Sequence, residues 1–189
     1  MLLGISQRIQ QWLGVKPKAS PRTDRLRPRT VVTWVIPGKL AVGGSPRPGD
    51  SVALAQAGIK VIFSLCAECE EVLPEDVTQS FHCLRLVLPD SHYKSEIKSS
   101  QLTAAIDIVQ HSIDNQLPIY VHCLAGIERS PTVCIAYLCQ SQHLELWEAL
   151  NWLKQCHPPS MPTESQLRVV RQYIKEQRSR SSASEISTS

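Results

Sequence analysis

Residues 118–131 read PIYVHCLAGIERSP and decide which fold the chain adopts. The first five form a mainly apolar run that is typical of a strand buried on both faces. Pro131 suits the first turn of a helix, where a backbone N–H would have no partner. The stretch therefore predicts a strand, a loop over 123–129 and a helix. Anions bind where a parallel strand ends and the next helix begins, so we expect the loop to hold an anionic ligand.

Strand-like and helix-like patterns alternate around this stretch. A hairpin over 31–42, with a Pro-Gly turn at 37–38, precedes apolar strands at 61–65 and 84–88. Hydrophobic residues at helical spacing predict helices near 50–57, 98–116, 131–142, 145–156 and 164–178. Strands separated by helices form parallel sheets that are covered on both faces. The sequence therefore predicts a single α/β domain, with a central sheet of four or five mostly parallel strands flanked by helices.

The chain divides into a leader, one domain and a tail. Residues 1–29 contain a short amphipathic helix and a Pro- and Arg-rich linker, residues 30–178 form the domain, and residues 179–189 are a Ser-rich tail expected to be disordered. Residues 1–30 hold seven basic residues against one acidic residue, whereas the whole chain carries +3, so the domain itself is net acidic. That distribution predicts no nucleic-acid-binding surface. The leader has three open roles, namely contact with an anionic membrane, docking on the domain and a mobile arm, and the oligomeric state is left undetermined.

The cysteines indicate the compartment. There are seven, an odd number, and several lie in apolar runs. Buried thiols of this kind are typical of a reducing compartment rather than of a secreted disulfide framework. No apolar run reaches the ~18 residues needed to cross a bilayer, and the N-terminus lacks a signal-peptide pattern. We therefore expect a soluble cytoplasmic protein.

The loop between strand and helix has the residues that phosphate chemistry needs. Arg129 offers a planar fork for two phosphate oxygens, and Gly126 permits a tight backbone path. The loop amides and the helix N-terminus favour the thiolate form of Cys123, which is a nucleophile. We expect Ser130 to donate a hydrogen bond to that sulfur and His122 to support the loop from behind. The predicted phosphate-binding residues are Leu124, Ala125, Gly126, Ile127, Glu128 and Arg129.

The pattern HC-x-x-G-x-x-RS over residues 122–130 resembles the signature of the protein tyrosine phosphatase superfamily. The extent of the domain, the hairpin at Ile36–Leu40 and Pro162 are similar to the dual-specificity branch. The resemblance implies a cysteine-dependent phosphatase that forms a phosphocysteine intermediate, needs no cofactor, and acts on phosphotyrosine and phosphoserine/threonine in proteins. A phosphatase of small-molecule, carbohydrate or inositol phosphates is the open alternative. A rhodanese-like sulfurtransferase and a non-catalytic phosphate-binding module are alternatives from other classes.

The leaving oxygen of a phosphate ester needs a proton, so a carboxylic acid must overlook the loop. Asp90 follows a predicted strand and lies 33 residues before Cys123. Its position is similar to that of the general acid in the resembled family. The alternative is a turn residue after Pro89, which is a common use of aspartate. Glu96 and Asp76 are the other candidate acids.

Glu128 departs from the resembled family, in which serine or glycine often stands at this position. An acid inside an anion-binding loop weakens the binding of a dianion unless its side chain turns outward, and it disfavours highly charged substrates. The variable loop positions also carry no lysine, whereas the inositol-lipid branch of the family often has lysines there. Both features argue against a phosphoinositide substrate.

Cys66 directly follows the strand at 61–65, which we expect to lie near the strand leading to Cys123. A nearby thiol can trap an oxidised nucleophile as a disulfide, so Cys66 is the candidate redox partner, with Cys69 as the second candidate. The alternative is a buried packing thiol. Cys66 and Cys69 also have the spacing of zinc ligands, but the downstream His82-Cys83 pair does not, so we predict no metal site.

Overall fold

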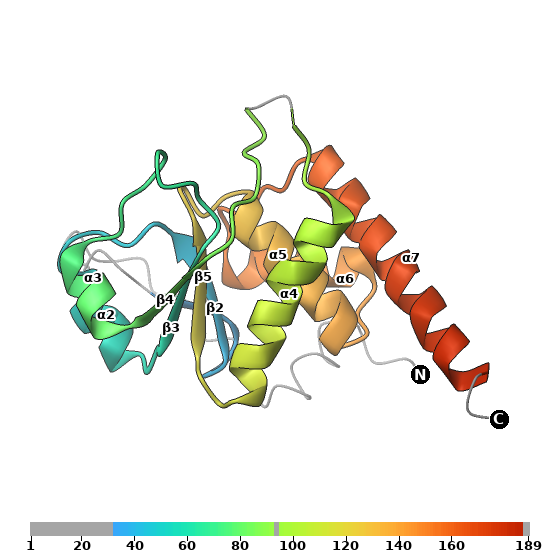
Figure 1. Ribbon diagram of the computed structural model, residues 1–189, viewed down its shortest axis with the longest axis horizontal. Helices are drawn as coiled ribbons and strands as arrows, with labels where there is room; N and C mark the ends of the chain where they lie inside the picture. Colours follow the sequence, from blue (N-terminus) through green and yellow to red (C-terminus); the bar gives the residue numbers. More distant parts are fainter. Residues whose placement is uncertain (1–31, 93–94, 187–189) are drawn as a thin grey trace.

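A five-stranded sheet forms the centre of the structure, which the computed structural model describes over residues 32–92 and 95–186. Its strands are β1 (Thr33–Ile36), β2 (Leu40–Gly44), β3 (Val61–Ser64), β4 (His82–Arg85) and β5 (Ile119–Cys123). They are ordered β1-β2-β5-β3-β4 (Figure 1). β1 and β2 are antiparallel, and every other neighbouring pair is parallel. The predicted α/β domain with a mostly parallel sheet is therefore confirmed.

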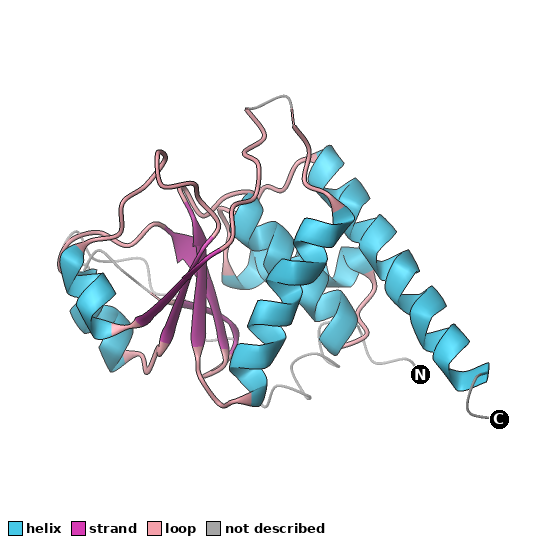
Figure 2. Cartoon of the chain, in the orientation of Figure 1, coloured by secondary structure: helices cyan, strands magenta, loops and turns pink. Residues whose placement is uncertain are grey.

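Helices cover both faces of this sheet. They are α2 (Asp50–Gln56), α3 (Glu75–Ser80), α4 (Ser99–Asp114), α5 (Arg129–Ser141), α6 (Leu146–Cys156) and α7 (Glu164–Ile186). The short helices α2 and α3 lie on one face, and the other four lie on the opposite face (Figure 2). α5 is in the middle of the larger layer and packs against α4, α6 and α7. Each α5 residue from Arg129 to Cys139 is buried, so this helix is the main core element.

The alternation of side chains along β5 divides the core in two. Val121 belongs to the large apolar cluster shared with α4 and α5. Tyr120 belongs to the smaller cluster, together with Leu54 of α2 and Val77 of α3. Successive side chains of a strand point to opposite faces. Cys123 therefore shares the face of α5, while the preceding His122 points to the side of α2 and α3.

The loop after β5 lies directly on the end of β2. Gly126 has a φ of 72°, and a Cβ there would come within 2.5 Å of the backbone of Gly43 and Gly44. The N–H of Ser45 donates to the carbonyl of Leu124 at 3.2 Å, which ties the same two segments together. Only glycine meets both demands at position 126, the left-handed backbone and the close approach.

The sequence did not predict α3, and the bounds of β4, α5 and α7 also differ from the prediction. β4 covers His82–Arg85 and not the predicted residues 84–88; it is a partly exposed edge strand, in which polar residues such as His82 and Arg85 are tolerated. α5 begins at Arg129, since the Glu128 carbonyl accepts the N–H of Thr132 at 3.0 Å and closes the first turn there. α7 continues to Ile186, so the tail predicted as disordered over 179–189 is helical in its first part; no glycine or proline ends the helix earlier.

The division of the chain into a leader, one domain and a tail stays a prediction. The amphipathic helix and the basic linker expected over 1–29 lie outside the described residues, and so do residues 187–189. Among the described residues, no helix is long and apolar enough to span a membrane.

The contact between Gly126 and β2 generates a stability prediction. Gly126→Ala should cost more than Gly38→Ala by about 1–3 kcal/mol of unfolding free energy, because the new methyl group meets the backbone of β2. Gly38→Ala is the matched control: its φ is 67°, but nothing lies within 4 Å of the added Cβ, so it loses only the left-handed preference. Urea unfolding of both variants gives the two values. Equal losses would contradict the tight packing of the loop on β2.

Candidate active site

Cys123 is the last residue of β5 and lies next to the first turn of α5. It is buried, with 3% of its surface exposed. Ser130 Oγ lies 3.4 Å from Cys123 Sγ and 3.1 Å from the carbonyl oxygen of Gly43. A hydroxyl donor therefore stands beside the sulfur, at the position that the sequence predicted for Ser130.

The backbone of loop 124–128 is held from outside through its carbonyl groups. The hydrogen-bond partners are Ser45 N for Leu124 (3.2 Å), His157 Nε2 for Gly126 (2.8 Å) and Met161 N for Ile127 (2.7 Å). In a trans peptide unit the N–H points opposite to the carbonyl, and the described chain has no cis peptide bond. The N–H groups that follow these carbonyls therefore point to the other side of the loop, where they are suited to hold an anion.

Arg129 is buried at the base of the loop with only 1% of its surface exposed. Its Nη1 lies 3.0 Å from Glu70 Oε2, and its Nη2 lies 2.8 Å from Asp90 Oδ2. The carbonyl oxygens of Leu88 and Leu65 lie 3.3 and 3.5 Å from Nη1. A buried charge is stable only with such partners, so the loops after β3 and β4 are bound to the phosphate loop through this guanidinium.

Asp90 lies beside Arg129, where a general acid would have to be. Its carboxylate also accepts the backbone N–H of His92 at 3.0 Å and contacts the His92 ring at 2.7 Å. Burial raises the pKa of Asp90, but the hydrogen bonds from His92 and the charge of Arg129 outweigh it, and the pKa falls below its usual value. Asp90 is therefore ionised at neutral pH in the ligand-free protein.

The carboxylate of Glu71, which is buried, lies behind the loop. Glu71 accepts hydrogen bonds from the hydroxyl groups of Ser64, at 3.0 Å, and Ser45. His122 Nδ1 is 3.8 Å from Glu71, too far for a hydrogen bond, and the His122 ring stacks on Tyr120 with 6.0 Å between centroids. Burial lowers the pKa of His122 to about 4, so the ring is neutral at pH 7. Neither ring nitrogen has a hydrogen-bond partner among the described residues, so the supporting role of His122 stays a prediction.

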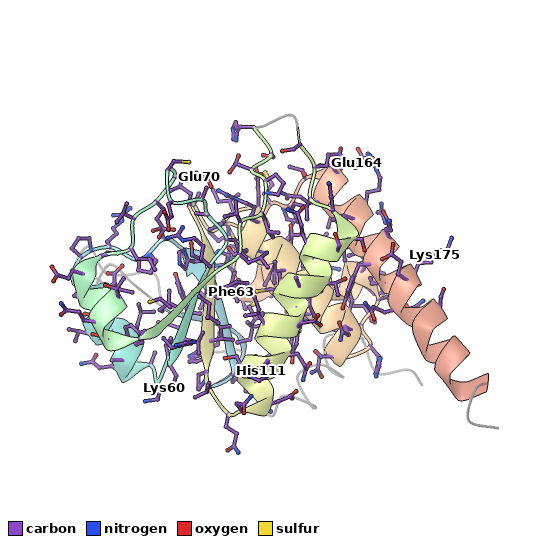
Figure 3. All side chains as sticks on the ribbon, in the orientation of Figure 1. Lys60, Phe63, Glu70, His111, Glu164 and Lys175 are labelled. Carbon is purple, nitrogen blue, oxygen red and sulfur yellow. The ribbon has the colours of Figure 1, made fainter. Side chains whose placement is uncertain are left out.

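One pocket of about 480 Å³ lies beside Cys123. Its lining includes Cys123, Arg129 and three acidic residues, Glu70, Asp90 and Glu128. Leu124 and Ile127 add exposed apolar side chains at the rim. Figure 3 shows Glu70 at the end of the sheet opposite to Lys60, on the side where the parallel strands finish. The pocket therefore has the place that the topology assigns to a ligand.

The structure brings together most of the predicted site residues and leaves the other candidate acids outside. Glu96 is exposed and lies 4.0 Å from Arg168. Asp76 lies in α3 and accepts the N–H of Gly49. Neither lines the pocket. Among the described residues, no cluster of His, Cys, Asp or Glu is placed to hold a metal ion.

Sequence reasoning missed Glu70, Glu71 and His92. The signal for the two glutamates was available, because they follow β3 just as Asp90 follows β4, at the same edge of the sheet. His92 had no comparable signal, since its role depends on the conformation of the loop after β4.

The proposed redox partner Cys66 lies close to the site but is fully buried. β3 and β5 are parallel neighbours, with Ser64 opposite His122, so Cys66 follows the adjacent strand as expected. Burial raises its pKa to about 12, which disfavours a reactive thiolate. Cys69 is exposed and lines the same pocket as Cys123. A disulfide from either residue to Cys123 stays a prediction.

Comparison with known proteins identifies the family of this chain. The model of the dual specificity phosphatase catalytic domain matches residues 43–176. Dual specificity protein phosphatase 1 of Mus musculus is 34% identical over 142 residues, covering 75% of this chain and 36% of that protein. Phosphatidylglycerophosphate phosphatase PTPMT2 of Arabidopsis thaliana is 25% identical over 150 residues, covering 79% of this chain and 66% of that protein. The chain thus spans about a third of the length of the mouse relative.

Solved structures have the same fold. PTPMT1 in complex with PI(5)P superimposes with a TM-score of 0.68 at 21% identity, covering 76% of this chain and 95% of that chain. Human DUSP28 gives a TM-score of 0.67 at 21% identity, covering 79% and 99%. The family match extends over more than half of the sequence and includes the whole phosphate loop. The chain therefore belongs to the cysteine-based dual-specificity phosphatases of the protein tyrosine phosphatase superfamily.

Proposed function

We propose that this protein hydrolyses phosphotyrosine and phosphoserine/threonine in proteins through a phosphocysteine intermediate on Cys123. The observation that carries the proposal is the convergence of a thiol, a guanidinium and a carboxylic acid on one pocket, with Asp90 2.8 Å from Arg129. A sulfurtransferase or a simple phosphate-binding module has no need of Asp90 or of Ser130 beside the sulfur. Hydrolysis of a phosphate ester uses all four groups, namely the thiol of Cys123, the guanidinium of Arg129, the carboxyl of Asp90 and the hydroxyl of Ser130.

In the first step the Cys123 thiolate attacks phosphorus in line with the leaving oxygen. A sulfur–phosphorus bond forms while the phosphorus–oxygen bond breaks, and Asp90 gives its proton to the departing oxygen. Arg129 and the loop N–H groups hold the other phosphate oxygens, whose charge they stabilise in the transition state.

The ion pair between Asp90 and Arg129 explains how an ionised aspartate becomes the acid. A phosphate dianion that binds Arg129 competes with Asp90 for the guanidinium. The dianion also adds negative charge next to the carboxylate, which favours its protonated form. Substrate binding thus moves the pKa of Asp90 upward from its lowered resting value. Substrate binding therefore favours the protonated form of Asp90 that the first step needs.

In the second step water attacks the phosphocysteine. Asp90, now ionised, accepts a proton from the water, and the sulfur–phosphorus bond breaks with its electron pair returning to sulfur. Ser130 Oγ, 3.4 Å from Sγ, is placed to donate a hydrogen bond to the departing thiolate. Inorganic phosphate is released and the thiolate is restored.

The choice of protein over lipid or sugar substrates rests on the pocket. Its described lining carries three carboxylates and exposed apolar side chains, with Arg129 as the sole lysine or arginine. The names of PTPMT1 and PTPMT2 keep phospholipid or small-molecule phosphates as the second candidate. Assays of phosphotyrosine and phosphothreonine peptides beside glucose and inositol phosphates test this choice. Faster turnover of the inositol or sugar phosphates would overturn it.

Cys123→Ser should reduce kcat to less than about a hundredth of the wild-type value, because the covalent path loses its nucleophile. Cys83→Ser, which changes a thiol outside the pocket, is the control and should keep its activity. Rapid acid quenching of the wild type with a phosphotyrosine peptide, followed by mass spectrometry, should find phosphate on Cys123. Phosphate on another residue, or full activity without Cys123, would refute the covalent mechanism.

Asp90→Asn should lower kcat for phenyl and alkyl phosphates by about 10²–10⁴-fold. The wild-type kcat should fall as pH rises through the pKa of Asp90 in the substrate complex, because the acid must be protonated; this alkaline limb should vanish in the variant. Esters of strongly acidic phenols should lose less, since they leave without a proton. Glu96→Gln, outside the pocket, is the matched control. A loss of the same size for all leaving groups would assign the proton to another residue.

A further inference from the structure

Among the residues that line the pocket, acidic side chains outnumber basic ones. Glu70 and Asp90 both pair with the guanidinium of Arg129, at 3.0 and 2.8 Å. Glu128 is the third carboxylate of the lining, and no ion pair joins it to a described cation. His92 lines the same pocket; its ring is engaged by Asp90 at 2.7 Å, and the charge of Glu128 contributes to raising its pKa. Even with His92 protonated, the lining holds three carboxylates against two cations, which leaves one negative charge for an incoming molecule to meet.

The backbone of Glu128 is fixed independently of its side chain. Its carbonyl oxygen accepts the N–H of Thr132 at 3.0 Å and the hydroxyl of Thr132 at 2.7 Å, which closes the first turn of α5. These contacts hold the residue at the end of the phosphate loop, directly before Arg129. A change of the side chain at position 128 therefore leaves these backbone contacts in place.

The Glu128 carboxylate is not fully hydrogen-bonded. Its Oε2 atom is buried and has no hydrogen-bond partner. A buried acceptor without a donor costs free energy, and a charged acceptor costs more than a neutral one. Glu128 as a whole is half-buried and lines the pocket, so a Lys or Arg side chain of a bound molecule can approach the carboxylate and, once the side chain turns outward, supply the missing donor, whereas a second phosphate would face like charge.

The other rim residues indicate what kind of molecule carries that donor. Leu124 is 51% exposed and Ile127 is 36% exposed, both on the loop that contains Glu128. These apolar side chains suit the aromatic ring and flanking side chains of a phosphopeptide. The ring of an inositol phosphate carries a polar group on each carbon, so it would leave these apolar surfaces without a match.

We propose that Glu128 is a specificity-determining residue, whose carboxylate accepts a hydrogen bond from a Lys or Arg next to the phosphorylated residue and repels a neighbouring acidic or phosphorylated group. The proposal rests on the phosphoprotein function given above and specifies its substrate class. The pocket then selects singly phosphorylated sites in basic surroundings.

The test compares two phosphotyrosine peptides that differ in one flanking residue, Lys or Glu. The wild type should have a kcat/KM about three- to tenfold higher for the Lys peptide, an effect of the size expected for charges near a solvated rim. Glu128→Gln should bring this ratio close to one, and Glu128→Lys should reverse it. The ratio should also shrink at about 0.5 M salt, since screening weakens an interaction between charges. Because each ratio is measured within one variant, a general loss of activity cancels out.

Asp107→Asn is the matched control, because it removes one exposed carboxylate of α4 outside the pocket. Its peptide ratio should equal that of the wild type. A ratio that is unchanged in both Glu128 variants, or that moves equally in Asp107→Asn, would overturn the role of Glu128. That failure differs from a failure of the proposed function, in which the wild type would turn over neither peptide while hydrolysing inositol bisphosphate or glucose phosphates. Such a result would overturn both proposals.

Discussion

The buried guanidinium of Arg129 is the interaction on which the arrangement of the site depends. A charge that is 1% exposed must find acceptors within the protein, and Arg129 finds them on the loops that follow β3 and β4. One side chain of α5 thus positions two loops that are distant from it in sequence. In the proposed mechanism a phosphate competes with Asp90 for this guanidinium, so the ligand replaces a contact that organises the free site.

The sequence was sufficient to predict the features that depend on residues close together in the chain. The strand, loop and helix around Cys123 are contiguous, and their pattern predicted the sheet, the place of Ser130 and the loop residues. Asp90 was found because it follows a strand at the same edge of the sheet. Glu70, Glu71 and His92 were missed because their contacts depend on how irregular loops fold back on the sheet. Helix ends were misplaced for a similar reason, since a carbonyl such as that of Glu128 can close a turn earlier than the side-chain pattern indicates.

The described cysteines differ in their neighbours more than in their burial. Burial raises the pKa of Cys66 and Cys139 to about 12 and that of Cys156 to about 11, so these thiols remain protonated at neutral pH. Cys123 is also buried, but it stands at the start of α5 beside a hydroxyl donor and shares its pocket with the guanidinium of Arg129. In the proposed mechanism, the neighbouring donors and not the degree of burial therefore distinguish Cys123 from these thiols.

Two of the three hydrogen bonds that hold the loop carbonyls come from His157 and Met161, in the segment between α6 and α7. The third comes from Ser45, at the end of β2. The contacts that shape the loop thus come from segments more than a hundred residues apart in the chain, although the signature itself is short. The signature is therefore not portable: transplanted alone onto another strand and helix, it would carry the nucleophile and the arginine but not the contacts that turn the loop amides inward.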